Sequence, residues 1–223
     1  MPTTALRCAV GFQGCALILL DFALLMAQHP DTQASPDAHA VPGTKSQSTQ
    51  QHRAEAPDVV RAFVLTVSDT RTVETDRGGA LIKELLQGAG HTITGHLIAR
   101  DDQAAIAQAV QSAMAGISDP EVVIVTGGSG ISARDVTSEA LRPLLTKELP
   151  GFGEVFRVLS WEEVGAATML SRAFAGVIGR TLLFVLPGST NAVRLAMEKL
   201  IVPELGHLVR EVRPERRETT YND

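Results

Sequence analysis

The stretch EVVIVTGGSG, residues 121–130, decides the fold that this chain is expected to adopt. Its first half is β-branched and apolar, as in a short strand that is buried on both faces of a sheet. Glycines then stand at positions 127, 128 and 130, and they leave a turn that is almost free of side chains. A buried strand that ends in such a turn before a helix is typical of a parallel sheet covered by helices.

The segments on either side continue this alternation of strand and helix. Predicted strands cover residues 59–68, 91–99, 121–126 and 181–186. Predicted helices are one that stops at Gly88, one from near 135, and those over 103–115, 161–174 and 191–200, with the sequence PGFG at 150–153 interpreted as a break. This order predicts an α/β fold over residues 58–213, a three-layer αβα domain with a mostly parallel central sheet, followed by a polar tail at 214–223.

Composition and charge exclude several classes of function. The chain has 223 residues, with 20 Lys and Arg against 25 Asp and Glu, so it has no basic excess to release counterions from a nucleic-acid backbone. Nucleic acid is therefore not expected as a partner. Cys8 and Cys15 are the only cysteines, and both precede the predicted domain. Disulfide, thiolate and zinc-cluster chemistry are thus excluded from that domain.

Residues 1–57 are predicted to be an extension without a fold of its own. An apolar stretch at 8–27 is long enough to span a bilayer, but Asp21 would place a costly carboxylate inside it. A secretory signal is disfavoured too, because many polar residues separate the apolar stretch from the small residues at 38–40. The rest of the extension is polar and is predicted to be a disordered linker. We therefore expect a cytoplasmic protein.

Ligands of an open parallel sheet bind outside the carboxyl ends of its strands. The loops to consider therefore follow residues 67, 99, 125 and 186. All of them carry polar or glycine-rich sequences, which are Ser68-Asp69-Thr70-Arg71, Arg100-Asp101-Asp102, Thr126-Gly127-Gly128-Ser129-Gly130 and Pro187-Gly188-Ser189-Thr190.

The glycine turn allows two interpretations of equal weight. Its backbone N–H groups could approach a phosphate near a helix N-terminus, or glycine could serve only the positive φ of a tight turn. The turn is not a Walker A loop, because no Gly-Lys-Ser/Thr follows. The spacing Gly128-x-Gly130-x-x-Ala133 fits a loose dinucleotide fingerprint, but no second strand presents an acid about 20 residues later. A nicotinamide oxidoreductase is therefore a distant alternative.

Two aspartates stand between a predicted strand and the helix after it. Either Asp101 or Asp135 could simply cap its helix, although Asp102 is the better placed cap beside Asp101. Together they could instead bind Mg²⁺, which proteins hold with one or two carboxylates plus substrate phosphates. Arg134 would offer a phosphate a positively charged fork, or it could form a surface pair with Asp135.

The remaining charged groups receive structural interpretations. His91 and His96 have no local zinc pattern around them and are interpreted as structural or exposed. The charged run at 210–218 is interpreted as the solvated end of the last helix.

Taken together, these loops resemble the MoaB/Mog family of molybdenum cofactor biosynthesis. The resemblance runs from about Arg61 to about Leu208 and is specific because its blocks occur in order. They are TVSDT at 66–70, DRGG at 76–79, TGGSG at 126–130, RDVT at 134–137, PGFGE at 150–154, MLSR at 169–172 and LPGS at 186–189.

This resemblance implies a fold of the molybdopterin-binding-domain type that assembles into trimers or hexamers. It implies a molybdopterin adenylyltransferase, which moves AMP from Mg-ATP to the terminal phosphate of molybdopterin and releases pyrophosphate. Asp101 and Asp135 carry over as catalytic residues and Mg²⁺ ligands. The expected substrate and nucleotide contacts are Ser68, Asp69, Gly127, Gly128, Ser129, Gly130, Arg134, Ser171, Pro187, Gly188 and Ser189. The protein that inserts molybdate is an expected partner.

Two departures from the family pattern keep a second function open. The turn has Gly-Gly-Ser-Gly where Gly-Gly-Thr-Gly is commoner, and Pro-Gly-Ser-Thr stands where clear adenylyltransferases carry Pro-Gly-Asn-Pro. The second departure is similar to the MoaB branch, some members of which lack the transferase activity. The alternative is therefore a non-catalytic molybdopterin-binding or assembly protein, although the retained RDVT block at 134–137 favours the enzyme.

Overall fold

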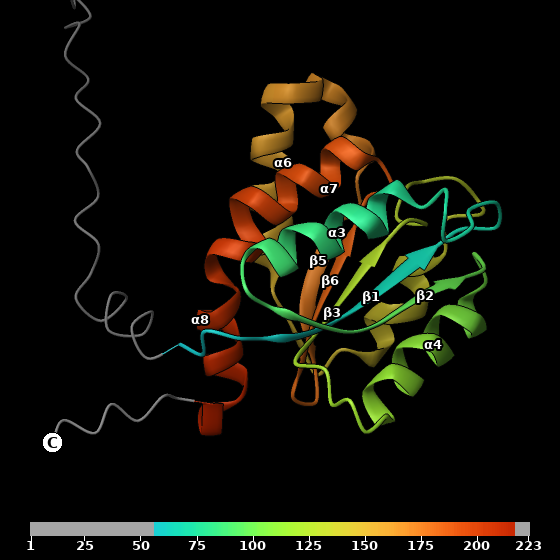
Figure 1. Ribbon diagram of the computed structural model, residues 1–223. Coiled ribbons are helices and arrows are strands. Elements are labelled where there is room, and N and C mark those ends of the chain that lie inside the picture. Colours follow the sequence, from blue (N-terminus) through green and yellow to red (C-terminus); the bar gives the residue numbers. More distant parts are fainter. Residues whose placement is uncertain (1–55, 217–223) are drawn as a thin grey trace, which may run out of the picture. The chain divides into compact units, whose positions relative to one another are not determined.

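The computed structural model describes residues 56–216, which form an α/β domain around one six-stranded sheet (Figure 1). The strand order is β2-β1-β3-β6-β5-β4. The strands are β1 (Arg61–Val67), β2 (Thr92–Ala99), β3 (Val122–Thr126), β4 (Lys147–Glu148), β5 (Phe174–Ile178) and β6 (Thr181–Leu186). The pairs β1–β2, β1–β3 and β3–β6 are parallel, whereas β5 joins β6 and β4 in antiparallel pairs. The predicted mostly parallel sheet is confirmed.

Helices cover both faces of this sheet (Figure 1). They are α3 (Arg77–Gly88), α4 (Gln103–Ala115), α5 (Thr137–Leu141), α6 (Pro150–Val164), α7 (Thr190–Ala196) and α8 (Val202–Val212). Shorter helical turns are η1 (Arg142–Leu144), η2 (Gly165–Leu170), η3 (Met197–Ile201) and η4 (Pro214–Arg216), of which η3 is a π-helical turn that joins α7 to α8.

The side chains of consecutive strand residues pack into two separate hydrophobic cores, because they point alternately to opposite faces of the sheet. Val64 and Ile124 belong to the core under α3, α6, α7 and α8. Their neighbours Leu65 and Val125 belong to the core under α4 and α5. Both faces are therefore apolar, and the predicted three-layer arrangement is confirmed. Within the described residues, no helix is long and apolar enough to cross a membrane. The predictions for residues 1–55 and 217–223 lie outside the described part of the chain.

The predicted helix over 161–174 is wrong. Helix α6 begins at Pro150, where proline suits a first helical turn, and ends before Gly165, whose φ is +58°. The PGFG sequence at 150–153 therefore starts a helix instead of breaking one. The chain continues through η2 into the buried strand β5, which begins at Phe174. The sequence pattern missed β4, which has two residues and pairs with β5 far along the chain, and β5, which forms an antiparallel hairpin with β6.

The charged run from 210 was also misinterpreted in part. Arg213, at the end of α8, is only 4% exposed. Its guanidinium donates to both carboxylate oxygens of Asp119, at 2.6 and 2.9 Å, and to the backbone oxygen of Arg180 at 2.9 Å. This part of the run therefore holds a buried guanidinium that pairs with the partly exposed Asp119 at the amino ends of the strands, and it is not a solvated helix end.

Candidate functional site

The predicted loops converge at the carboxyl ends of the parallel strands. The N–H of Ser68, after β1, donates to Ala99 at the end of β2 at 2.9 Å. The N–H of Gly127, after β3, donates to Leu186 at the end of β6 at 3.2 Å. Four segments that are distant in sequence therefore meet at one edge of the sheet.

The glycine turn is held in a shape that other residues would strain. Gly127 and Gly128 have φ values of +105° and +60°. A Cβ on Gly127 would collide with the carbonyl oxygen of Val67, and one on Gly128 would lie 2.8 Å from the Asp101 carboxylate. Thr137 closes the turn, since its N–H and hydroxyl donate to the Gly128 and Gly127 carbonyls at 3.0 Å each. The positive-φ interpretation thus holds for two of the glycines.

The same turn leaves N–H groups available for a ligand. Within the described residues, the N–H groups of Gly128, Ser129 and Gly130 donate no hydrogen bond. Buried or half-buried amides normally find a partner, so these donors suit an acceptor that comes from outside the chain. The tight turn and the phosphate contact are therefore compatible interpretations of one loop.

The two predicted carboxylates flank this turn. The Asp101 side chain accepts from the N–H of Val136 at 3.4 Å, and the Asp135 side chain accepts from the N–H of Ser132 at 2.9 Å. Neither caps a helix as the alternative interpretation required. Asp102 caps α4 by accepting from the N–H of Ala105 at 2.9 Å, as predicted.

Within the described residues, the Asp101 carboxylate forms no ion pair. Partial burial is the main cause that raises the pKa of Asp101, and the charges of Asp135 and Asp69 raise it further, whereas the hydrogen bond from the N–H of Val136 and the charge of Arg134 lower it. A partly buried carboxylate with a raised pKa is a candidate functional group. A cation beside Asp101 would stabilise the charged carboxylate, and a proton would neutralise it.

The chemistry of the carboxylates fits Mg²⁺. Asp101 Oδ2 and Asp135 Oδ1 accept no hydrogen bond from the described residues. Within those residues, no cluster of three or more His, Cys, Asp or Glu side chains could hold a metal. The protein would thus supply two hard oxygen ligands and leave the others to water and phosphate, which is how Mg²⁺ is usually bound.

Arg134 differs from the prediction in its partner. Its guanidinium pairs with Asp69 and not with Asp135, and this bond is the main reason that the pKa of Asp69 is lowered. Asp69 also accepts from the N–H of Asp101 at 3.2 Å. Asp69 therefore positions the backbone of Asp101. Because the Arg134 side chain is 71% exposed, the pair itself lies at the surface.

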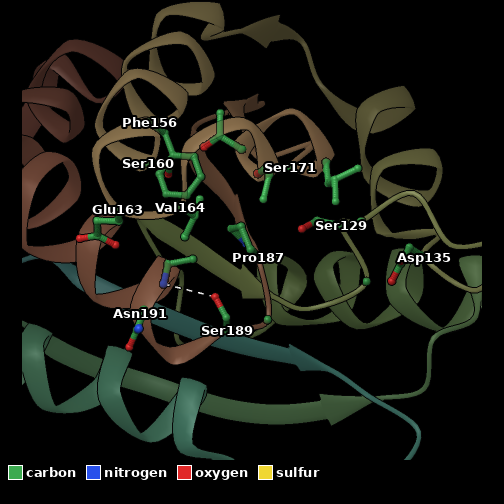
Figure 2. A pocket seen from close by; sticks show the side chains of 17 residues that line it. Ser129, Asp135, Phe156, Ser160, Glu163, Val164, Ser171, Pro187, Ser189 and Asn191 are labelled. Carbon is green, nitrogen blue, oxygen red and sulfur yellow. Dashed lines mark hydrogen bonds between the residues drawn. The ribbon is translucent and has the colours of Figure 1, made fainter.

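A cavity of about 380 Å³ opens beside the turn. Figure 2 shows Ser129 and Asp135 at one end of it and Glu163 and Asn191 at the other. The predicted residues that line it are Gly128, Ser129, Gly130, Asp135, Ser171, Pro187, Gly188 and Ser189. The other predicted residues, Ser68, Asp69, Asp101, Gly127 and Arg134, lie outside its lining. Ser68 and Asp69 instead line an open hollow beside β2.

One whole wall of this cavity was missed by sequence reasoning. It comes from α6, η2 and α7 and consists of Phe156, Ser160, Glu163, Val164, Ala167, Thr168, Leu170, Asn191 and Ala192. Thr168 is 8% exposed, and its hydroxyl has no hydrogen-bond partner within the described residues. The PGFGE and MLSR blocks lie at the two ends of the α6–η2 segment and could have signalled it, but the predicted helix over 161–174 obscured the corner between α6 and η2.

Two arginines hold the loops in place and were not predicted to do so. Arg172 donates to the backbone oxygens of Gly130 at 2.8 Å and Asp135 at 2.7 Å, and it pairs with Glu139. Arg71 donates to the backbone oxygen of Gly188 at 2.9 Å. The glycine turn, the Asp135 loop and the Pro187-Gly188 loop are thus tied to segments that are far away in sequence.

Comparisons with known proteins agree with this geometry. A family model described as "Probable molybdopterin binding domain" matches residues 63–207. Molybdenum cofactor biosynthesis protein B of Bacillus subtilis is 52% identical over 172 residues, which is 76% of this chain and 99% of that protein. A crystal structure of a molybdenum cofactor biosynthesis protein B is 52% identical with a TM-score of 0.69, covering 71% of this chain and 99% of that one. The crystal structure of the tungsten cofactor synthesizing protein MoaB from Pyrococcus furiosus is 41% identical with a TM-score of 0.64, with the same coverage.

Proposed function

Because this chain belongs to the MoaB/Mog family of molybdenum cofactor biosynthesis, we propose that it transfers AMP from ATP to the terminal phosphate of molybdopterin and releases pyrophosphate. A role in molybdenum cofactor biosynthesis rests on the family itself. The transfer of the adenylyl group is the finer proposal and rests on the site.

The observation that carries the proposal is the position of two carboxylates at one glycine turn. A Cβ on Gly128 would lie 2.8 Å from the Asp101 carboxylate, and one on Gly130 would lie 2.7 Å from the Asp135 carboxylate. Asp135 lines the cavity directly. Nucleotidyl transfer asks a protein mainly to position phosphates and to neutralise their charge, and this arrangement offers both functions.

Each group in the site has a role in such a transfer. The free N–H groups of Gly128, Ser129 and Gly130 would bind phosphate oxygens. Asp101 and Asp135 would hold Mg²⁺, which neutralises the charge of the ATP phosphates when bound. Arg172 keeps the turn and the Asp135 loop in register through its bonds to both backbones. The terminal phosphate of molybdopterin would then attack the α-phosphorus of ATP, and pyrophosphate would leave.

The shape of the cavity suits a ring that carries a phosphate. Its α6–η2 wall has an apolar part with Phe156, Val164 and Leu170 and an unpartnered hydroxyl at Thr168. Small-molecule sites commonly combine an apolar wall with a few convergent polar groups. We assign this wall to the heterocycle of molybdopterin and the glycine turn to the phosphates.

A molybdopterin-binding protein without transferase activity is the second candidate. It is favoured by the observation that Asp101 lies outside the cavity lining and that Arg134 is already paired with Asp69. Such a protein would bind molybdopterin in the same cavity without consuming ATP.

The test is Mg-ATP-dependent formation of adenylylated molybdopterin by the full chain. We expect Asp101→Asn and Asp135→Asn each to lower the rate by about a hundredfold or more, because each removes a charged ligand from the site. Asp102→Asn is the matched control, since asparagine also caps a helix and the rate is expected to stay unchanged.

Either of two results would sink the proposal. Full turnover by the Asp135→Asn variant would remove the carboxylate from the mechanism. A wild-type chain that binds molybdopterin but forms no product would establish the second candidate. The expected trimer or hexamer, the contact with the molybdate-insertion protein and the cytoplasmic location stay predictions.

A further inference from the structure

A second cavity, of about 400 Å³, lies beside the first, and the proposed reaction assigns it no role. It lies among α5, η1, α6 and the segment that leads into β5, and Ser171 lines both cavities. A ligand in the first cavity could therefore extend a group into the second.

The second cavity is lined by three arginines, and one of them lacks a counter-charge. Arg172 pairs with Glu139, and Arg142 pairs with Glu148 and stacks 4.3 Å from the ring centre of Phe174. Arg157, on α6, forms no ion pair and no hydrogen bond within the described residues.

The local structure makes room for the Arg157 guanidinium. Gly153 lies one turn earlier on α6, and a Cβ there would be 3.1 Å from Arg157 Nη1 and 2.8 Å from the backbone oxygen of Ala173. A larger residue would push the guanidinium away. Glu154 also precedes Arg157 by one turn, but the two form no ion pair. The positive charge thus stays available to a ligand.

Ser138 supplies a second polar group without a partner in the lining of the second cavity, within the described residues. It is 3% exposed, and its hydroxyl has no hydrogen-bond partner within the described residues. A buried hydroxyl without a partner is uncommon in folded proteins, so the Ser138 hydroxyl is a donor that suits an acceptor from outside the chain. An anion with several acceptor oxygens would satisfy both the serine and the unpaired guanidinium.

We propose that the second cavity binds a phosphate group, with Arg157 as its charged contact and Ser138 as a neutral one. The inference rests on the proposed function only for the source of that phosphate, which would be a phosphate of the substrates or the released pyrophosphate. The binding site itself requires no adenylyl transfer.

The test measures binding of inorganic pyrophosphate and inorganic phosphate to the full chain by isothermal titration calorimetry. We expect Arg157→Gln to weaken pyrophosphate binding at least tenfold, because a charge-assisted contact is lost. Arg157→Lys keeps the charge but not the planar fork, so its affinity should be intermediate. Arg180→Gln is the control, since this exposed arginine pairs with Glu215 at the other end of the sheet, and it should change affinity less than twofold.

Competition distinguishes the two sources of phosphate. Displacement of pyrophosphate by Mg-ATP would assign the cavity to a phosphate of the substrates, and simultaneous binding would assign it to free phosphate or pyrophosphate. Wild-type binding of neither anion, or equal affinity of the wild type and a folded Arg157→Gln variant, would overturn the proposal. Neither result depends on turnover, so failure of the adenylyltransferase proposal remains separately visible.

Discussion

The two ends of the central sheet each carry an aspartate, and the charges around these two aspartates differ. At the amino ends of the strands, Asp119 is bracketed by guanidinium groups, with Arg213 at 2.6 and 2.9 Å and Arg61 at 3.0 Å. These partners, Arg213 first, lower the pKa of Asp119 to about 2. At the carboxyl ends, Asp101 forms no ion pair with an arginine of the described residues, and its pKa is raised by burial and by the charges of Asp135 and Asp69, although the charge of Arg134 lowers it.

We interpret this difference as one between a cluster that stabilises the fold and the proposed ligand site. The arginines beside Asp119 lower its pKa, so folding favours its charged form. An acid held near another acid costs stability until a cation or a phosphate-bound metal arrives. This unfavourable arrangement of carboxylates lies at the carboxyl ends of the parallel strands, beside the glycine turn and the cavity.

The largest expected effect on stability is at the end that carries Asp119. Arg213→Ala should lower the free energy of unfolding by about 3 kcal/mol, because it removes a buried guanidinium that satisfies two backbone oxygens and pairs with the half-exposed Asp119. Urea unfolding monitored by circular dichroism measures it. Arg194→Ala, which loses only an exposed pair with Glu198, is the control and should cost less than about 0.5 kcal/mol. Similar losses in both variants would contradict the assigned role of Arg213.

The next effect is at the glycine turn. Gly128→Ala should cost about 2 kcal/mol and abolish adenylyl transfer, because a φ of +60° strains alanine and its Cβ would displace the Asp101 carboxylate. Gly151→Ala is the matched control, since nothing lies within 4 Å of its Cβ, and alanine favours the helix. Unfolding curves and product formation would be compared for both variants, and an active Gly128→Ala protein would show that the turn is not rigid.

A third prediction uses the opposite pKa shifts of the two acids. The lowered pKa of Asp119 means that its contribution to stability is present above about pH 4 and is lost as the pH falls toward 2. The raised pKa of Asp101 means the reverse, so its contribution is present below about pH 4 and is lost as the pH rises through the folded value. Because 59% of the Asp119 side chain is exposed, water screens its share of this effect.

Unfolding free energies at pH 3 and pH 7 measure these signs. Relative to wild type, Asp119→Asn should be less stable at pH 7, whereas Asp101→Asn should be at least as stable as wild type there. Adenylyl transfer should also fall with decreasing pH as Asp101 becomes protonated. If Asp101→Asn lost as much stability at pH 7 as Asp119→Asn, the two aspartates would not differ in their effect on folding, and this prediction would be wrong.

The smallest expected effect is at the surface pair beside the site. Arg134→Gln should change the free energy of unfolding by less than about 0.5 kcal/mol, because the arginine is exposed. The pKa of Asp69 should rise toward its ordinary value when its main partner is lost. Titration of Asp69 by NMR measures the shift, and an unchanged value would show that the pair does not persist in solution.

Much of the site was predictable because its residues directly follow strands. The buried runs at 121–126 and 181–186 are strands β3 and β6, and the loops after them meet as expected for parallel neighbours. The Asp102 cap was equally predictable, because capping is a contact between residues three positions apart.

Other parts of the site depend on partners that no local pattern reveals. The pairing of Arg134 with Asp69 joins residues 65 positions apart, and Arg172 reaches Gly130 across 42 positions. The α6–η2 wall of the cavity was missed because its residues were predicted to form a helix over 161–174, whereas α6 ends before Gly165 and the chain continues through η2 toward β5.

The sequence by itself determined the order of the parallel strands β1, β2, β3 and β6, the glycine turn and the placement of Asp101 and Asp135 in the loops after β2 and β3. These features depend on periodicity and on contacts between near neighbours, which a linear pattern records. Only the tertiary structure decided the antiparallel strands β4 and β5, the cavity wall, the absence of an ion pair at Arg157 within the described residues and the charge balance around each aspartate. Burial and Coulomb interactions depend on distances in space, so residues far apart in the chain set the pKa values and the contacts that distinguish a ligand site from a structural ion pair.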